Sequence, residues 1–148
     1  MDTKLLENLS WEMPKEVQEK TIKEIVTLKE LNLEELLQPI DKKYWKNCAE
    51  VLYEIGYPKI KKIIPGLLIW LQDINWPGAN IVIELLMKVP KNELVFYIEE
   101  STKVALKNSD EMWLDNLSYF LVSLDLMEED FNIVDIYLEL ERRTEFWR

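Results

Sequence analysis

The chain has 148 residues, a length that predicts one domain spanning residues 1–148. Apolar residue types make up 48% of the chain, which excludes the composition of a disordered segment. Asp and Glu outnumber Lys and Arg by 28 to 18, and the net charge of -10 repels phosphate backbones and anionic lipids. We therefore expect neither nucleic acid nor a membrane as a partner.

The chain contains no His and a single cysteine, Cys48. The lack of His excludes Ser-His and Cys-His nucleophile pairs and imidazole metal sites, and one cysteine excludes an intrachain disulfide. The first ten residues lack the basic start and apolar run of a secretory signal. The longest apolar run, residues 63–71, contains Pro65 and Gly66 and falls below the roughly 20 residues of a membrane span. The expected compartment is the reducing cytoplasm.

Helical periodicity extends through the chain, and no segment has the alternating pattern of a strand. Glycine is scarce, at three residues, and most of the six prolines stand where helices could begin. Apolar residues at three-to-four spacing predict helices over residues 14–30, 42–55, 58–71, 77–88, 90–107, 110–125 and 130–145, with one further turn over 32–38. Because the connections are short, we expect an all-α fold of about seven antiparallel helices.

Cap-forming residues and prolines predict several helix boundaries. Ser10 or Trp11 marks the entry to the 14–30 helix, and the candidate caps are, in chain order, Asp41, Gly56, Asn75 and Ser109. Pro65 should kink the 58–71 segment or restart it, and Pro77 fits an early position of its helix.

Two internal similarities favour a repeat architecture. Trp45 and its apolar neighbours resemble Trp113 and its neighbours at an offset of 68 residues, and an offset of 65 separates Trp11 from Trp76. Half of each offset falls near the lower end of the roughly 34 to 47 residues of helical solenoid repeats. We expect a HEAT-like superhelical stack, with a helical bundle as the alternative.

Several segments are similar to a known family. They are Leu9-Ser10-Trp11 with Pro14, Trp45 with Asn47-Cys48-Ala49, the segment Trp70-Leu71-Gln72-Asp73-Ile74-Asn75-Trp76-Pro77-Gly78-Ala79, and Trp113-Leu114 with Leu117. Together they resemble the bacterial family called domain of unknown function 5071, and the central ten residues are the specific part. The resemblance implies a HEAT-like helical stack in small stand-alone bacterial proteins. It brings no catalytic residues.

The turn that holds Gln72, Asp73, Asn75 and Trp76 is the one constellation that apolar periodicity does not explain. Turns positioned by rigid helices are where binding groups concentrate, so these four residues are candidate contacts. A structural role is the alternative, because Asp73 or Asn75 could accept hydrogen bonds from the next helix and Gly78 would allow close helix approach.

Five of the six tryptophans divide into two groups. Trp45, Trp70 and Trp113 occupy or border apolar stripes and are expected to pack in the core. Trp11 and Trp76 stand where helices begin and are the better surface candidates.

We interpret the acidic runs and the single cysteine as structural residues, not catalytic ones. The acidic runs Glu34-Glu35, Glu99-Glu100, Asp110-Glu111 and 128–130 fall on expected polar faces or helix starts. Cys48 lies on an inward face with no His partner. The sequence therefore predicts no catalytic residue, no metal site and no cofactor.

These features favour a protein-binding module whose acidity would steer a basic partner, as in an adaptor or immunity-type protein. The alternative is an enzyme with a Trp/Asp site in residues 70–79, related by fold only to DNA-alkylation-repeat glycosylases. The chain lacks the basic groove that such an enzyme needs. A scaffold or self-assembling unit is a third class, and the oligomeric state is left open.

Overall fold

The computed structural model describes residues 1–148 as helices joined by short connections, without any β-strand. The elements, with η for 3-10 turns, are α1 (Thr3–Asn8), α2 (Lys15–Val26), η1 (Leu33–Leu36), η2 (Lys42–Tyr44), α3 (Trp45–Ile55), η3 (Lys59–Ile63), α4 (Ile64–Trp70), α5 (Ala79–Leu86), α6 (Lys91–Lys107), α7 (Glu111–Ser123), η4 (Glu128–Asp130), α8 (Val134–Glu141) and η5 (Thr144–Trp147). The expected all-α class is confirmed, with eight α-helices in place of about seven.

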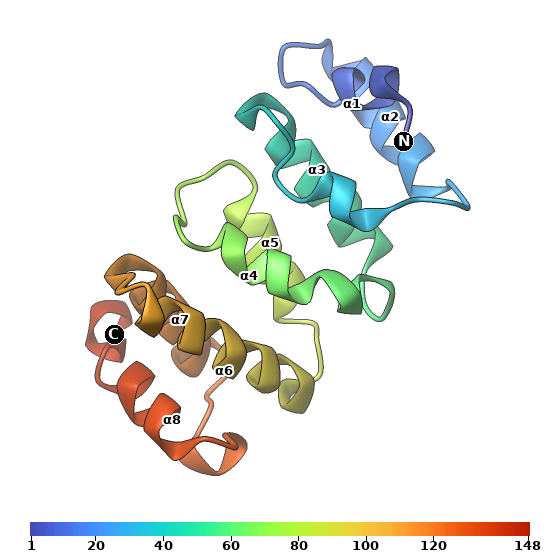
Figure 1. The fold of residues 1–148 in the computed structure, drawn as a ribbon. Helices are drawn as coiled ribbons and strands as arrows, with labels where there is room; N and C mark the ends of the chain where they lie inside the picture. The colour runs from blue at the N-terminus through green and yellow to red at the C-terminus, as the bar shows by residue number, and fades with distance from the viewer.

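The helices lie in a row that follows the chain, from α1 and α2 at one end to α8 at the other (Figure 1). Helices α2 and α3 run in the same direction. Their first halves meet where Gln18 accepts a hydrogen bond from Asn47, and their last residues, Val26 and Ile55, line one pocket. The chain returns between them through η1 and η2, so this pair differs from the expected antiparallel neighbours.

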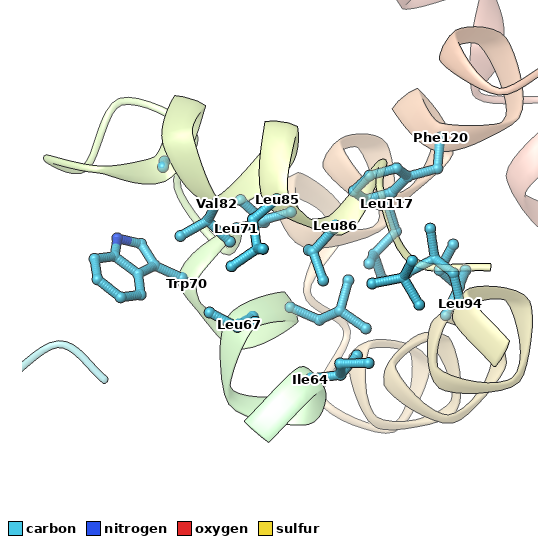
Figure 2. Close-up of a cluster of buried hydrophobic side chains, with 14 of the residues drawn as sticks. Ile64, Leu67, Trp70, Leu71, Val82, Leu85, Leu86, Leu94, Leu117 and Phe120 are labelled. Carbon is cyan, nitrogen blue, oxygen red and sulfur yellow. The ribbon is translucent and has the colours of Figure 1, made fainter. Parts of the chain in front are cut away.

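One cluster of 32 buried apolar residues forms the core, with members from Leu9 to Leu140. Figure 2 shows its central part, where side chains of α4, α5, α6 and α7 meet. The labelled residues are Ile64, Leu67, Trp70, Leu71, Val82, Leu85, Leu86, Leu94, Leu117 and Phe120. The helices are therefore held by burial of the apolar stripes that the periodicity predicts.

Three expected boundaries are confirmed. The Asp41 carboxylate accepts the backbone N–H of Lys43 at 3.0 Å and caps η2. Gly56 ends α3 with a φ of 69°, a conformation that favours glycine. Pro65 stands in the first turn of α4, which restarts after η3 as a separate helix.

The expected starts of α5 and α7 are wrong by one or more residues. Gly78 adopts a left-handed conformation, so α5 begins only at Ala79; Asn75 caps nothing and Pro77 precedes the helix. Ser109 has a φ of 53°, and the neighbouring Asp110 caps α7 by accepting the Trp113 backbone N–H at 3.1 Å.

The ends of the chain also differ from the expectation. Helix α1, capped by Asp2, was not predicted. The entry to α2 lies later than Ser10 or Trp11. The Ser10 hydroxyl accepts the Glu12 N–H within a turn that precedes the helix, and Pro14 is the N-cap. Helix α2 stops at Val26, where Thr27 closes its last turn by a hydrogen bond to Glu24.

The helix expected over residues 130–145 is divided into η4, α8 and η5. The segment before α8 is held in a non-helical path by Glu99 of α6, whose carboxylate accepts the backbone N–H groups of Asn132 and Ile133. Glu99 is 2% exposed, so the expectation of a polar-face position is wrong for this residue.

Candidate functional site

The turn between α4 and α5 is closed by its own polar groups. One carboxylate oxygen of Asp73 accepts the backbone N–H of Asn75 at 2.8 Å, and the Asp73 carbonyl accepts that of Trp76 at 3.1 Å. The Asn75 side chain is exposed and makes no hydrogen bond within the protein. Asp73 therefore stabilises the turn itself and does not cap α5, while Asn75 remains free.

Helix α7 holds the same turn from the other side. The buried side-chain amide of Asn116 donates to the carbonyl of Leu71 at 2.8 Å and to that of Gln72 at 3.4 Å. The Gln72 side chain is half-buried and has no hydrogen-bond partner in the protein. The turn is thus fixed in position by a residue 44 positions away in the sequence.

Three tryptophan rings pack edge to face beside this turn. The Trp45 ring, in the first turn of α3, lies 6.2 Å from the Trp70 ring and 5.7 Å from the Trp76 ring. A Cβ atom added to Gly78 would lie 2.9 Å from the Ala49 side chain and 3.0 Å from the Trp45 carbonyl. Glycine is therefore required for this close approach, as the sequence predicts.

Trp11, between α1 and α2, contacts the same region from its N-terminal side. Its backbone N–H donates to the carbonyl of Lys43 at 3.0 Å, two residues before Trp45, and its side chain is 53% exposed. The Trp11 backbone and the Trp76 ring therefore both contact the segment 42–45. We call this surface the tryptophan edge and define it as Trp11, Trp76 and residues 42–45.

The indole N–H groups separate the tryptophans into two classes. Four of the six donate to acceptors inside the protein. These are Trp45 to the Pro39 carbonyl at 2.6 Å, Trp70 to Pro77 at 3.0 Å, Trp113 to Leu68 at 3.0 Å and Trp147 to Asp115 at 2.8 Å. The two without an internal acceptor are Trp11 and Trp76, the two predicted surface candidates. The Trp76 indole nitrogen has no internal acceptor and is not buried, so it reaches solvent.

Charged side chains of both signs surround the tryptophan edge. The Glu12 carboxylate lies 3.5 Å from the Lys43 amine and is the main cause of the raised pKa of Lys43. The Lys42 amine lies 5.9 Å from the centre of the Trp45 ring, within cation–π range. The edge therefore offers indole and ammonium donors beside carboxylate acceptors.

Two other titratable groups, Cys48 and Glu93, have pKa values shifted away from neutrality. Burial raises the pKa of the Cys48 thiol to about 12. Hydrogen bonds from the Tyr57 hydroxyl and then from Lys61, at 3.0 Å, lower the pKa of Glu93. Sequence reasoning missed this trio because its members are up to 36 residues apart and no local pattern links them. No group of three or more Cys, Asp or Glu side chains is arranged to hold a metal ion.

Two buried asparagines form a repeated device that sequence reasoning also missed. Asn47 of α3 donates to the carbonyl of Leu9 at 2.7 Å, and Asn116 of α7 donates to that of Leu71 at 2.8 Å. Leu9 and Leu71 are the C-caps of α1 and α4, so each asparagine satisfies a free carbonyl at the end of an earlier helix. One sequence feature could have indicated this pair: each asparagine follows a tryptophan, Asn47 by two residues and Asn116 by three.

None of the helices combines the length and apolar character that crossing a membrane requires. Comparison with curated proteins and with solved structures gives no match. A family model described as Domain of unknown function (DUF5071) matches residues 37–141, more than half of the chain, including Trp45, the segment 70–79 and Trp113. The chain therefore belongs to the DUF5071 family, a domain of unknown function.

Proposed function

We propose that this protein is a HEAT-like protein-binding module whose contact surface is the tryptophan edge. One observation carries the proposal: Trp11 and Trp76 are the two tryptophans whose indole N–H groups lack an internal acceptor, and both lie against residues 42–45.

A repeat-like stack is supported by the row of helices and by the repeated asparagine device. Helices α3 and α5 also begin at the same edge as α2, because Gly78 approaches Trp45 and Ala49 at the start of α3. In such a stack the connections at one edge come close together although they are far apart in sequence. Loops positioned in this way by rigid helices are common sites of binding.

The binding role is supported by the chemistry of these two indoles, of which Trp11 is exposed and Trp76 is half-buried. Tryptophan is enriched among the residues that dominate interface energies, because it buries a large rigid ring and can donate one hydrogen bond. When Trp11 and Trp76 are covered by a partner, each N–H needs an acceptor. Backbone carbonyl groups of a loop or extended segment would supply these acceptors.

The proposed partner is a basic protein. The net charge of -10 would raise the rate of encounter with a basic surface and oppose binding of nucleic acid. The proposed compartment is the cytoplasm, since the one cysteine is buried and unpaired.

We propose binding in preference to catalysis at the 70–79 segment, with no cofactor. Asp73 already accepts the Asn75 N–H, and Trp76 packs against Trp45, so both residues of the alternative Trp/Asp site have structural contacts. The pKa values of Cys48 and Glu93 move away from neutrality, which favours fixed charge states over proton transfer near pH 7.

The test is affinity capture from a lysate with the tagged chain as bait, using matched variants. Trp11→Ala and Trp76→Ala should each weaken the captured partner by about 2 kcal/mol or more, whereas Trp11→Phe and Trp76→Phe should cost about 0.5–1.5 kcal/mol, the usual net value of one hydrogen bond. Phe146→Ala is the control, because this aromatic ring is 71% exposed but lies in η5 at the other end of the chain. Equal capture by all five variants would contradict the proposal.

A further inference from the structure

A second candidate site lies at the opposite edge of the row, where α2 and α3 end (Figure 1). A pocket of about 220 Å³ opens there, and five of its seven lining residues are apolar, among them Val26, Leu28 and Ile55. Lys29 and Lys59 complete its lining. An adjoining pocket of about 250 Å³ shares Lys59 with the first.

Lysines with no ion-pair partner surround these two pockets. Lys29, Lys59 and Lys62 form no salt bridge, whereas their neighbour Lys61 lies 3.0 Å from a carboxylate oxygen of Glu93. Eleven of the fifteen lysines form no salt bridge, so these three are distinguished by their position at the pockets and not by the missing partner. The apolar pocket therefore has a cationic rim.

This combination indicates the class of ligand. An apolar floor binds an aliphatic chain, and ammonium groups at the rim bind an anionic end. The lining contains no aromatic side chain on which a nucleotide base could stack, and one carboxylate, Glu34, which is too few to hold a cation. The volume is too small for a helix and suits a single linear chain.

We propose that this pocket binds a small amphipathic carboxylate, a medium-length aliphatic chain that ends in a carboxylate group. The chain would lie on Val26, Leu28 and Ile55, and the carboxylate would be held by Lys59 with Lys29 or Lys62. This site is independent of the tryptophan edge.

Isothermal titration calorimetry with sodium decanoate tests the assignment. We expect binding of one decanoate per chain with a Kd below about 1 mM, and binding of decanol or acetate weaker by about tenfold or more, because each lacks one half of the ligand. Lys59→Gln should weaken decanoate by about fivefold or more. Lys61→Gln, the control, removes the same charge two residues away without touching the pocket and should change the Kd by less than about twofold.

Leu28→Ser tests the apolar floor at a residue that is 36% exposed, and should weaken decanoate by about threefold or more while the melting temperature stays near that of the wild type. The absence of decanoate binding would overturn the proposal. So would equal losses in Lys59→Gln and Lys61→Gln, or decanol binding as tightly as decanoate. Tighter binding of a Leu-terminated tetrapeptide with a free carboxylate would overturn the assignment to a small molecule.

Discussion

Glu99 is a buried carboxylate that joins α6 to the start of α8. It is 2% exposed and accepts three hydrogen bonds, from the Asn132 N–H at 3.0 Å, the Ile133 N–H at 2.6 Å and the Asn132 side-chain amide at 3.0 Å. We predict that Glu99→Ala lowers the free energy of unfolding substantially, because it leaves two backbone N–H groups without their acceptor and opens a cavity beside α6.

The expected magnitude follows from these contacts. A hydrogen bond to a charged group contributes about 1.5–3 kcal/mol, but the Asn132 side chain is exposed and water can replace part of what is lost. We therefore expect a loss of about 2–4 kcal/mol, below the sum of three bonds. For a chain of this length, that loss corresponds to a fall in melting temperature of about 4–16 °C.

Urea unfolding followed by circular dichroism measures this change directly. Glu100→Ala is the matched control, since Glu100 is exposed and makes one surface ion pair with Lys103 at 3.3 Å. A free energy of unfolding for Glu99→Ala within about 0.5 kcal/mol of the wild type would refute the reasoning, because typical surface substitutions fall in that range.

Four further predictions concern the turn, a glycine, the cysteine and nucleic acid. Asp73→Ala should cost about 0.5–2 kcal/mol by removing the turn hydrogen bond, whereas Asn75→Ala should leave the melting temperature unchanged; the opposite order would contradict the assigned roles. Gly78→Ala should destabilise the fold more than Gly56→Ala in urea unfolding, since both have positive φ but only at residue 78 would the new Cβ meet atoms closer than 3.4 Å. Burial raises the Cys48 pKa from 9.0 to about 12, so the native thiol should resist iodoacetamide at pH 8 and react in urea. The stability that this burial contributes should be complete below pH 9.0 and decline as the pH rises toward 12, because the unfolded thiol ionises first. Oligonucleotides should show no sub-micromolar binding in fluorescence anisotropy at about 150 mM salt, and tight binding would contradict the charge argument.

Much of the secondary structure could be predicted because it depends on residues close in sequence. The three-to-four spacing of apolar residues predicts the helices, and Asp41, Gly56 and Pro65 mark boundaries through contacts within a few residues. Predictions of two helix starts were wrong because the backbone adopts positive φ there. Gly78 has a positive φ, so α5 begins at Ala79; Ser109 has a positive φ, so Asp110 caps α7.

The candidate site could be predicted in part. Trp11 is exposed whereas Trp70 and Trp113 are buried. The sequence predicts this difference, because Trp70 and Trp113 occupy or border apolar helix stripes and Trp11 does not. The sequence could not show that Trp11 and Trp76, 65 residues apart, lie against one segment. That arrangement depends on how successive helices stack.

The helical class, the absence of His chemistry and the inward faces of the helices can be read from the amino-acid order, because they follow from composition and from contacts between near neighbours. Three features depend instead on long-range packing: the burial of Glu99, the internal acceptors of four indole N–H groups, and the position of unpaired lysines beside apolar residues in one pocket. The physical reason is that desolvation and hydrogen-bond pairing of a side chain depend on the elements packed against it. For Glu99 and Trp113 those partners lie 33 and 45 residues away.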